Sequence, residues 1–380
     1  MNNENVFAGQ LPEGPLAVAV SGGVDSLCAL LLCKKAGRSV LALHARLSSC
    51  AGEEAMAKAR LREERLQDAC QKIGCELHIL DLQDRFDSEV VQPFAKAYAK
   101  GMTPNPCVLC NRRIKFGAFF DYAQSLGASG LVTGHYASLV YNHPYKGSAP
   151  LLGTAKDVIK DQSYFLGQVP RSRLAQIAFP LAALEKKDVR AIVASAGLSV
   201  PEPKESQDIC FIPHTPTGYR DFLLARWKQQ GEEASGAGDI VEIDTGRIIG
   251  RHKGLWQYTE GQRQGLGIPW NEPLYVLGKN AEQNVLLVGG RKHTQKTTAV
   301  LHSPNFMIEP DEIPDTVLVR LRYRQKPVRA HIHIAGNAVH ISCEEALFLS
   351  APGQTGIVLD DQMRLLLAGT IAKQKACSIN

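Results

Sequence analysis

The sequence lacks any long apolar segment. The longest apolar run near its start is Leu27–Cys33, far shorter than the roughly 20 residues that a membrane-spanning helix needs. The first residues, Met1–Glu4, have neither the basic region nor the apolar core of a secretory leader. We therefore expect a cytoplasmic protein that has no membrane partner.

The sequence also lacks a second pair of closely spaced cysteines. Among ten cysteines, Cys107 and Cys110 form one CxxC motif, whereas a structural zinc site needs four ligands and commonly takes them from two such pairs. Zinc is therefore the less favoured interpretation. Without export the cysteines stay reduced, and four of them lie on predicted helix or strand faces, where they would pack as small apolar groups: Cys28, Cys33, Cys70 and Cys75.

The composition is that of an ordinary folded protein. A length of 380 residues suggests two or three domains, and 44% hydrophobic with 21% charged residues argues against wholesale disorder. The 43 basic and 38 acidic residues leave a net charge of +5. That charge is compatible with a polyanionic partner such as a nucleic acid, but it does not identify one.

The first two hundred or so residues alternate between predicted strands and helices, which indicates a doubly wound parallel α/β sheet. Ligands of such sheets bind at the carboxyl ends of the strands, where Ser21–Ser26 and Thr133–His135 fall. The expected strands are Leu16–Val20, Val40–Leu43, Glu76–Leu80 and Gly130–Val132, and the expected helices are Leu27–Lys35, Glu53–Ile73, Ser88–Ala99 and Asn111–Leu126.

The pattern changes after about Ile212. Glycine-rich stretches with short strands follow, which predicts a small β-rich central domain. From about Lys292, apolar and polar residues alternate at period two, as in Val317–Tyr323 and His331–Ile334, and this alternation predicts a small barrel or sandwich. We expect a catalytic domain at residues 1–212, the central domain at 213–291 and a C-terminal β-barrel at 292–380.

Ser21–Ser26, with the sequence SGGVDS, follows the first strand and opens a helix. Its glycines allow a sharp bend and a close approach to a ligand, and free N–H groups at a helix start bind phosphate. The loop has no Gly-Lys-Ser/Thr ending and no GxGxxG pattern. Because Asp25 would repel bare phosphate, we expect a divalent cation between its carboxylate and the phosphate oxygens.

The segment Thr103–Asn111, with the sequence TPNPCVLCN, is extended by its two prolines, and a helix is expected to begin just after them. A thiol at a helix start has a lowered pKa and favours the thiolate. A third isolated cysteine, Cys210, follows much later. These thiols suit sulfur chemistry, in which one carries a persulfide and another resolves it.

The loop Ser21–Ser26 resembles the signature of the ATP pyrophosphatase (PP-loop) superfamily, whose members cleave ATP between the α and β phosphates to adenylate a carbonyl oxygen. Over nearly the whole chain the sequence resembles the tRNA-specific 2-thiouridylase family (MnmA). The matching segments are Ser21–Ser26, Thr103–Asn111, Ile114–Phe116, Thr133–Ala137, Lys160–Leu166, Asp208–Ile212, Gly261–Ile268 and Arg322–Gln325.

This resemblance implies an ATP-dependent tRNA sulfurtransferase that adenylates the C2 oxygen of the wobble uridine at position 34 and replaces it with sulfur. It implies Cys210 as the persulfide carrier and Cys110 as its partner. ATP with Mg²⁺ would be held by Ala19, Val20, Ser21, Gly22, Gly23, Val24, Asp25, Ser26, Ala45 and Gly134. The tRNA would contact Asn105, Pro106, Cys107, Lys160, Asp161, Gln162, Arg322 and Tyr323. The sulfur would come from a cysteine desulfurase or a sulfur-relay protein.

Cys107 departs from the family pattern, because the best-known members carry aspartate there. A carboxylate acid–base role is therefore not transferred to this position. Three cysteines, Cys107, Cys110 and Cys210, are also the ligand set that would bind a 4Fe–4S cluster and leave one iron open for hydrosulfide. The cluster is a hypothesis that stands beside the persulfide, with Cys107 as a further catalytic candidate.

The RNA side of the site is predicted from charge and spacing. Arg320, Arg322 and Arg324 alternate on a predicted strand, so period two puts them on one face, where they would contact phosphates or simply face solvent. His135 and Tyr136 would either stack on a base or pack at a strand end. The stretch Lys160–Phe165 would form a flexible wall of the base pocket.

Two other functions compete with tRNA thiolation. A PP-loop amide-forming synthetase, of the argininosuccinate or asparagine synthetase type, shares adenylation but has no need for Cys110 and Cys210. A non-catalytic RNA-binding protein would bind tRNA without releasing pyrophosphate, and the intact Ser21–Ser26 loop argues against it.

Overall fold

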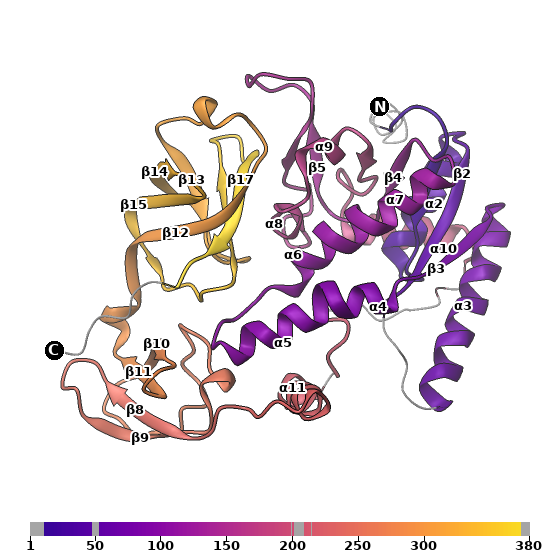
Figure 1. Ribbon diagram of the computed structural model, residues 1–380. Coiled ribbons are helices and arrows are strands. Elements are labelled where there is room, and N and C mark those ends of the chain that lie inside the picture. Colours follow the sequence, from indigo (N-terminus) through magenta and orange to yellow (C-terminus); the bar gives the residue numbers. More distant parts are fainter. Residues whose placement is uncertain (1–10, 48–52, 199, 201–208, 214, 374–380) are drawn as a thin grey trace. The chain divides into compact units, whose positions relative to one another are not determined.

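The computed structural model (Figure 1) describes residues 11–47, 53–198, 200, 209–213 and 215–373. The chain divides into two compact units. The first comprises Met1–Val90, Cys107–Gln207 and Met363–Leu365, and the second comprises Val91–Pro106, Asp208–Gln362 and Leu366–Asn380. Within the described ranges, no helix is both long and apolar enough to cross a membrane.

The first unit is built on a five-stranded sheet in the order β3-β2-β1-β4-β7. All neighbouring strands in it are parallel, which confirms the predicted doubly wound α/β class. The central strand pairs on both sides, with Leu16 opposite Val40 in one neighbour and opposite Gly130 in the other. The strands are β1 (Leu16–Ala19), β2 (Val40–Arg46), β3 (Leu77–Asp81), β4 (Gly130–Val132) and β7 (Ile177–Ala178).

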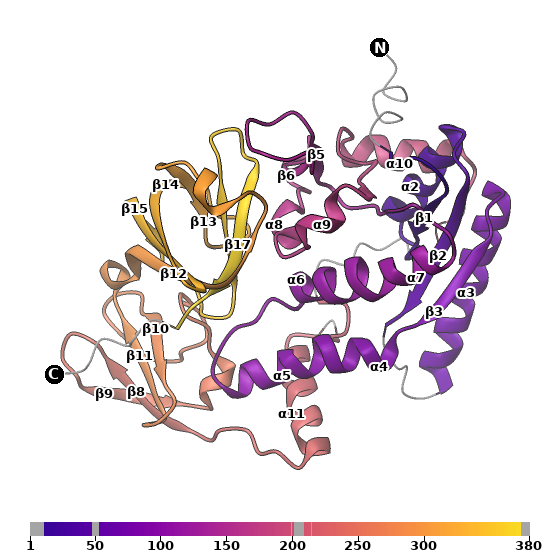
Figure 2. The ribbon, with the colours of Figure 1, turned by 45° about the horizontal axis from the view of Figure 1, so that its top comes forward.

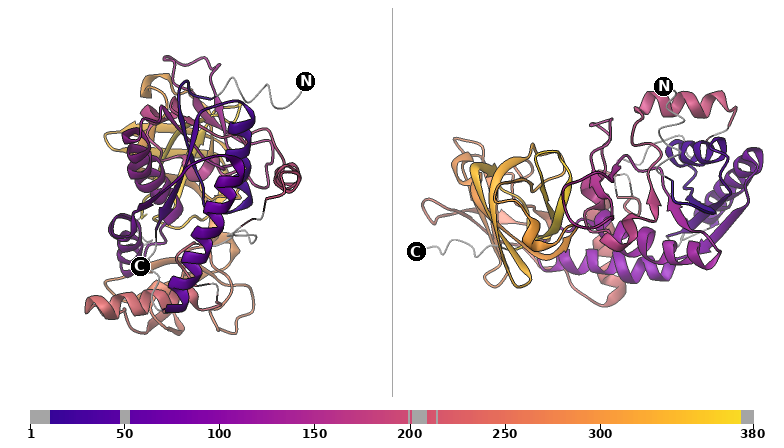
Figure 3. Two further views of the ribbon diagram at one scale, coloured as in Figure 1. Left: turned by 90° about the vertical axis from the view of Figure 1, so that its right-hand side faces the viewer. Right: turned by 90° about the horizontal axis from the view of Figure 1, so that it is seen from above.

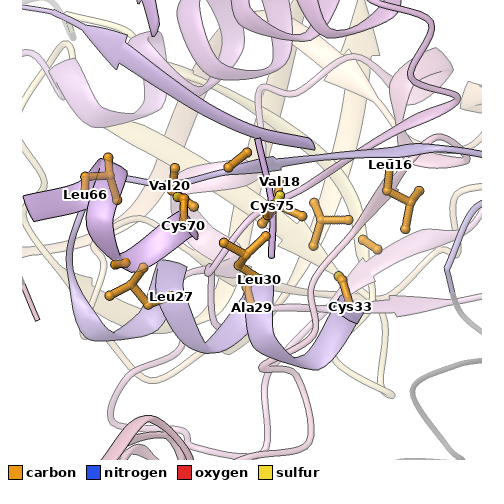
Figure 4. Close-up of a cluster of buried hydrophobic side chains, with 14 of the residues drawn as sticks. Leu16, Val18, Val20, Leu27, Ala29, Leu30, Cys33, Leu66, Cys70 and Cys75 are labelled. Carbon is orange, nitrogen blue, oxygen red and sulfur yellow. The ribbon is translucent and has the colours of Figure 1, made fainter. Parts of the chain in front are cut away.

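Two helices cover one face of this sheet, α2 (Val24–Lys35) and α3 (Glu53–Ile73). Period-two alternation turns Leu16, Val18 and Val20 toward them, and all three are buried (Figure 4). The expected apolar stripe of α3 lies in the same core, since Leu66, Ala69 and Cys70 are buried there and Ile73 is partly buried against them. Figure 2 shows α3 lying beside β3 at the sheet's outer edge.

The cysteines predicted to pack do so. Cys33, Cys70 and Cys75 belong to this core, and Cys28 lies in a second cluster, on the side of α2 that meets α10 (Lys186–Ser195). Burial raises the pKa of the Cys28, Cys33 and Cys70 thiols to about 12, so they remain protonated and unreactive. Cys343 is also buried, and Cys50 and Cys377 lie outside the described residues.

The chain between β3 and β4 is almost entirely helical, as expected. Its second half runs without a break from Pro106 to Ser125 but loses helical geometry at Gly117, where φ is −107° and ψ is −108°. Its segments are α4 (Gln83–Phe86), η1 (Asp87–Val91), α5 (Gln92–Ala99), α6 (Pro106–Cys110), η2 (Asn111–Ala118) and α7 (Phe119–Ser125). After β4 come β5 (Ser138–Val140), β6 (Leu151–Gly153), α8 (Ser163–Leu166) and α9 (Arg171–Leu174).

The second unit contains a four-stranded sheet in the order β10-β11-β8-β9, as the glycine-rich sequence after residue 212 predicts. Its core includes Ile240, Val276 and Leu286. A separate apolar cluster joins Phe94 of α5 to Trp227 and Trp256. The elements are α11 (Gly218–Gln230), β8 (Gly238–Glu242), β9 (Ile248–His252), η3 (Leu255–Gln257), β10 (Tyr275–Asn280), β11 (Val285–Gly289) and η4 (Arg291–Thr294).

The C-terminal strands close into a barrel in the order β12-β15-β14-β13-β16-β17 (Figure 3), so the barrel, and not the sandwich, is confirmed. Alternation along β15 buries Val339, Ile341 and Cys343 and exposes His340 and Ser342. The elements are β12 (Gln295–Phe306), η5 (Pro310–Glu312), β13 (Val317–Arg320), β14 (Val328–Ala335), β15 (Ala338–Phe348), β16 (Thr355–Leu359) and β17 (Leu365–Ile371).

One strand prediction is wrong. The strand expected over Val317–Tyr323 ends at Arg320, because the Gln325 side chain accepts a hydrogen bond from the Leu321 N–H at 3.0 Å and the Gln325 N–H donates to the Arg322 carbonyl at 3.1 Å. These bonds close a turn. Arg322 and Arg324 therefore do not continue a strand stripe with Arg320, and the Arg322 guanidinium lies 5.2 Å from the centre of the Phe348 ring instead.

Candidate active site of the first unit

The glycine loop between β1 and α2 is closed by its own hydroxyls. The Ser26 hydroxyl donates to the Gly23 carbonyl at 2.9 Å and accepts from the Ser21 N–H at 3.1 Å. Gly22 has a φ of 88°, a conformation that favours glycine. Ser21 is exposed and Gly22 and Ser26 are buried. The loop is therefore preformed at the carboxyl end of β1, where a phosphate would meet the N-terminus of α2.

Asp25 in this loop is neutralised by a lysine that lies far away in sequence. The Lys186 ammonium donates to both Asp25 carboxylate oxygens at 2.8 Å, and the lysine is nearly buried. The protein itself therefore supplies a positive charge beside the Asp25 carboxylate.

Tyr136 is a second hydrogen-bond donor to Asp25. Its hydroxyl donates to one Asp25 oxygen at 2.9 Å. Burial, followed by the charge of Asp25, raises the pKa of the Tyr136 hydroxyl, so it stays a donor at neutral pH. Tyr136 is buried, and packing at a strand end is thus the correct one of its two predicted roles.

His135 is likewise a packed residue. It is buried against the rings of Phe116 and Phe179, with centroid distances of 5.9 and 6.1 Å. Burial, together with Lys115, holds the pKa of His135 well below its usual range. The imidazole is therefore neutral: Lys115 donates to Nε2 at 3.3 Å, and Nδ1 pairs with the Thr133 hydroxyl at 2.7 Å.

Gly134 lies directly against the glycine loop. A Cβ at this position would come within 2.8 Å of the Asp25 carbonyl carbon and 2.9 Å of the Ser26 nitrogen. No side chain fits between the end of β4 and the start of α2, so glycine is required by close approach of the two backbones.

The segment after β6 is tied to the same lysine. The Lys186 N–H donates to Asp157 at 3.0 Å, and the other carboxylate oxygen of Asp157 accepts from the Ile159 and Lys160 N–H groups at 3.2 Å. Val158 and Ile159 at the tip are 78% and 79% exposed. The Asp25 neighbourhood and this exposed tip are therefore linked through Lys186.

The polar residues after Lys160 are bonded within the unit. Asp161 is buried and accepts from the Ala155 N–H and the Ser163 hydroxyl at 2.9 and 2.8 Å. The Gln162 side chain accepts from the Tyr136 N–H at 3.0 Å. Tyr164 is fully buried in α8, so the stretch predicted to be a flexible wall is bonded and packed at these positions.

The CxxC motif opens the helical segment that begins at Pro106. Cys107 is exposed in its first turn, whereas Cys110, three residues on, is buried. Asn105 and Pro106, which precede them, belong to the second unit. Cys210, also in the second unit, is exposed in a turn next to Phe211. Asp208 of the same motif lies outside the described residues.

The remaining predicted nucleotide residues lie at the strand ends beside the loop. Ala19 ends β1, Val20 follows it, and Ala45 lies in β2. His44, which precedes Ala45 in β2, has no partner at Nε2 among the described residues, while its Nδ1 bonds the Val20 carbonyl at 2.8 Å. Since a carbonyl only accepts, Nδ1 carries the proton.

Sequence reasoning did not identify Lys186 or Asp157 as site residues, and it did not identify Tyr136 as a hydrogen-bond donor to Asp25. The signal for Lys186 was weak: it is one of two adjacent lysines at a helix start, and the capping box of Glu185 and Asp188 explains that start without any reference to a ligand. Only Lys186 is turned inward; Lys187 is exposed and pairs with Glu185 at 2.6 Å.

Three family models match the chain in order. The tRNA methyl transferase HUP domain matches residues 15–214, the tRNA methyl transferase PRC-barrel domain matches residues 222–290, and the aminomethyltransferase beta-barrel domain matches residues 296–371. Together they account for both units.

Curated relatives are similar over their full length. A tRNA-specific 2-thiouridylase MnmA of Nitratidesulfovibrio vulgaris is 43% identical over 94% of this chain and 98% of its own length. One from Caulobacter vibrioides is 36% identical over 95% and 96%.

A solved structure, the U34-tRNA thiolase NcsA from Methanococcus maripaludis with its 4Fe–4S cluster, covers 60% of this chain and 73% of its own at 15% identity and a TM-score of 0.34. Similarity at that level does not bear on the site residues. The full-length matches to curated relatives and the three consecutive family models place this chain in the tRNA-specific 2-thiouridylase (MnmA) family.

Proposed function

We propose that this enzyme thiolates the wobble uridine, position 34, of tRNA. ATP adenylates the C2 carbonyl oxygen of the uracil with release of pyrophosphate, and sulfur then displaces AMP to leave 2-thiouridine. The observation that carries the proposal is the preformed Ser21–Ser26 loop at the end of β1, backed by the Lys186–Asp25 pair, in a chain that belongs to the 2-thiouridylase family.

The activation step is supported by the charges around the loop. The N-terminus of α2 and the Lys186 ammonium both stabilise negative charge, which accumulates as pyrophosphate leaves. We assign Ser21, Gly22, Gly23 and Ser26 to the phosphates. Ala19, Val20, Val24, Ala45 and Gly134 are assigned to the rest of the nucleotide pocket.

Mg²⁺ would enter as part of the ATP complex. In that complex the cation neutralises phosphate oxygens. The divalent cation expected beside Asp25 stays part of this proposal, and we derive no step through the ion.

The sulfur step is proposed to use two thiols. Cys210 carries a persulfide, and the Cys110 thiolate attacks the Cys210 sulfur atom, so that a Cys110–Cys210 disulfide forms and the terminal sulfur leaves as hydrosulfide. Hydrosulfide attacks C2, and the C2–O bond to AMP breaks. The two thiols are oxidised as the sulfur is reduced, so an external dithiol must reduce the disulfide before the next turnover.

A 4Fe–4S cluster on Cys107, Cys110 and Cys210 is the competing sulfur carrier. Within the part of the chain that the structure describes, no three His, Cys, Asp or Glu side chains are grouped to hold a metal ion. Because Cys107 and Cys110 belong to the first unit and Cys210 to the second, we derive no step through the cluster. Anaerobic reconstitution with iron and sulfide tests this, because a cluster would give visible thiolate-to-iron absorption.

The tRNA contacts remain part of the proposal. We assign Asn105, Pro106 and Cys107 to the target base. Lys160, Asp161, Gln162, Arg322 and Tyr323 are assigned to the surrounding tRNA. A cysteine desulfurase or relay protein would load the persulfide, and the three-domain division at residues 1–212, 213–291 and 292–380 goes with this assignment.

The decisive experiment is thiolation of unmodified tRNA with ATP, magnesium and a sulfur donor, followed by mass spectrometry of the digested RNA. We expect 2-thiouridine from the wild-type protein, and none from Cys110→Ser or Cys210→Ser, which should still bind ATP. Cys343→Ala, a buried barrel cysteine, is the matched control and should retain activity. Unmodified uridine in the fully supplied wild-type reaction would refute the function.

A further inference from the structure

The segment Gly101–Pro106 leads directly into Cys107. It can form few backbone hydrogen bonds within itself. Pro104 and Pro106 have no N–H group, so the segment cannot close a helix turn or a strand ladder of its own. The Met102 N–H is used to finish α5, at 2.9 Å from the Ala97 carbonyl. Its carbonyl groups must therefore find donors elsewhere.

Those donors come from the second unit, to which Gly101–Pro106 itself belongs. The Gln354 side-chain amide donates to the Thr103 carbonyl at 2.7 Å and to the Pro104 carbonyl at 3.2 Å. The Thr103 N–H donates in turn to the Pro352 carbonyl at 2.9 Å. One turn of the barrel thus bonds both the Thr103 N–H and the Thr103 and Pro104 carbonyl groups.

That turn, Ala351–Gln354, is itself fixed to the barrel. The Gln354 N–H donates to the Ala351 carbonyl at 3.2 Å, and Gly353 and Gln354 exchange hydrogen bonds with Ile371 at the end of β17, at 2.9 and 2.8 Å. Gly353 has a φ of 90°, and a Cβ on it would lie 3.3 Å from the Thr103 carbonyl oxygen. The positive φ favours glycine at this position, and a side chain there would press on the Thr103 backbone.

The N-terminal end of the segment, at Gly101, is bonded by Lys279 of strand β10 in the four-stranded sheet. The Lys279 ammonium, 2% exposed, donates to the Gly101 carbonyl at 2.7 Å and lies 3.8 Å from Glu260, whose side chain is 6% exposed. The Thr103 hydroxyl donates to the Thr259 hydroxyl at 3.2 Å. The buried ammonium is thus held between the Glu260 carboxylate and the Gly101 carbonyl, and it fixes the position of that carbonyl.

From these contacts we infer that the Ala351–Gln354 turn and Lys279 form a clamp on Gly101–Pro106, and that Gln354 is a positioning residue for tRNA thiolation. The inference rests on the proposed function: the clamp holds extended the stretch that carries Asn105 and Pro106 to the target base and enters the helix at Cys107. The barrel, in this view, orders the segment that precedes Cys107 as well as contacting RNA.

The test is a donor series at Gln354. Gln354→Met keeps the length and removes both donors, Gln354→Glu places a carboxylate against two carbonyl oxygens, and Gln354→Lys restores a donor. We expect the kcat of thiolation to fall about tenfold with Met, further with Glu, and only two- to threefold with Lys. The KM for ATP should stay unchanged. Gln283→Met, on an exposed turn of the same unit, is the control.

A purely structural role would make kcat follow the melting temperature and not the presence of a donor. Thr259→Val, which removes one acceptor of the same clamp, should lower kcat modestly without changing the KM for ATP. Wild-type kcat in Gln354→Met, or a loss in the Lys variant as large as in Met, would overturn the clamp. Absence of thiolation by the wild-type protein would instead overturn the proposed function.

Discussion

The Lys186 ammonium lies 2.8 Å from both carboxylate oxygens of Asp25, although the two residues are 161 positions apart. The pair joins α2 to α10 at the place where phosphate is proposed to bind. Asp25 is 33% exposed and Lys186 11%, so solvent only partly screens their interaction.

Lys186→Met should strongly impair ATP use. It leaves the Asp25 carboxylate uncompensated beside a polyanion and removes a charge-assisted hydrogen bond. We expect kcat/KM for ATP to fall roughly 100-fold, equivalent to about 2.7 kcal/mol of transition-state stabilisation. Pyrophosphate release during tRNA-dependent turnover measures this.

The matched control is the next residue. Lys187→Met removes an exposed lysine that pairs with Glu185 on the surface, and surface pairs contribute little. Its kcat/KM should stay within twofold of the wild-type value; equal losses in the two variants would show that charge near α10, and not the Asp25 pair, matters.

Gly134→Ala should disturb the loop through backbone contact alone. The added Cβ would lie 2.8 Å from the Asp25 carbonyl carbon, so the end of β4 and the start of α2 must separate. We expect an ATP dissociation constant at least tenfold higher, measured by calorimetry, and a lower melting temperature. Gly236→Ala, where a Cβ meets nothing within 4 Å, should change neither, and unaltered ATP binding in Gly134→Ala would contradict the close approach.

The buried thiols should make stability depend on alkaline pH. Burial raises the pKa of Cys33 from 9.0 to about 12, so the folded thiol stays neutral while the unfolded one ionises. Because the pKa is raised in the folded state, the contribution of the thiol to the free energy of unfolding is fully present below pH 9. It is lost as the pH rises toward 12. The expected slope is about −1.4 kcal/mol per pH unit for each such thiol, measured by urea unfolding.

Cys33→Ala should make the slope of unfolding free energy against pH shallower. The variant should nevertheless be less stable than the wild-type protein at pH 8. The same burial predicts selective alkylation of the native protein: the exposed Cys107 and Cys210 should react with iodoacetamide at pH 8, whereas Cys28, Cys33 and Cys70 should not. Equal labelling of all five in peptide mass spectra would contradict the buried assignment.

Arg322→Ala should weaken tRNA binding and reduce its salt dependence. If the guanidinium contacts one phosphate, the slope of log K against log salt should become shallower by about 0.7 to 0.9. Arg251→Ala, an exposed arginine 3.6 Å from Asp239, serves as control. An unchanged slope would leave Arg322 with its ring contact to Phe348 as its role.

Local patterns in the sequence were enough for four strands of the parallel sheet and the helices between them, the loop Ser21–Ser26 at the end of β1, the burial of Cys33 and Cys70, and the strand-rich C-terminal region. They did not predict β5, β6 or β7, and they left the barrel and the sandwich open. Periodicity and glycine punctuation report contacts between residues that are neighbours along an element. They failed at Arg320, where a side chain five residues later ended a strand that the alternation would have continued.

Tertiary structure alone decided which residues meet across the fold. The amino-acid sequence determined that Asp25 lies in a glycine loop after the first strand and that Cys107 follows two prolines. Lys186 reaches Asp25, and Gln354 reaches the Thr103 carbonyl 251 positions away, only once the sheet and the barrel have formed. No local sequence pattern identifies the distant partner of a charged or amide side chain, because packing of the two backbones decides which residues meet.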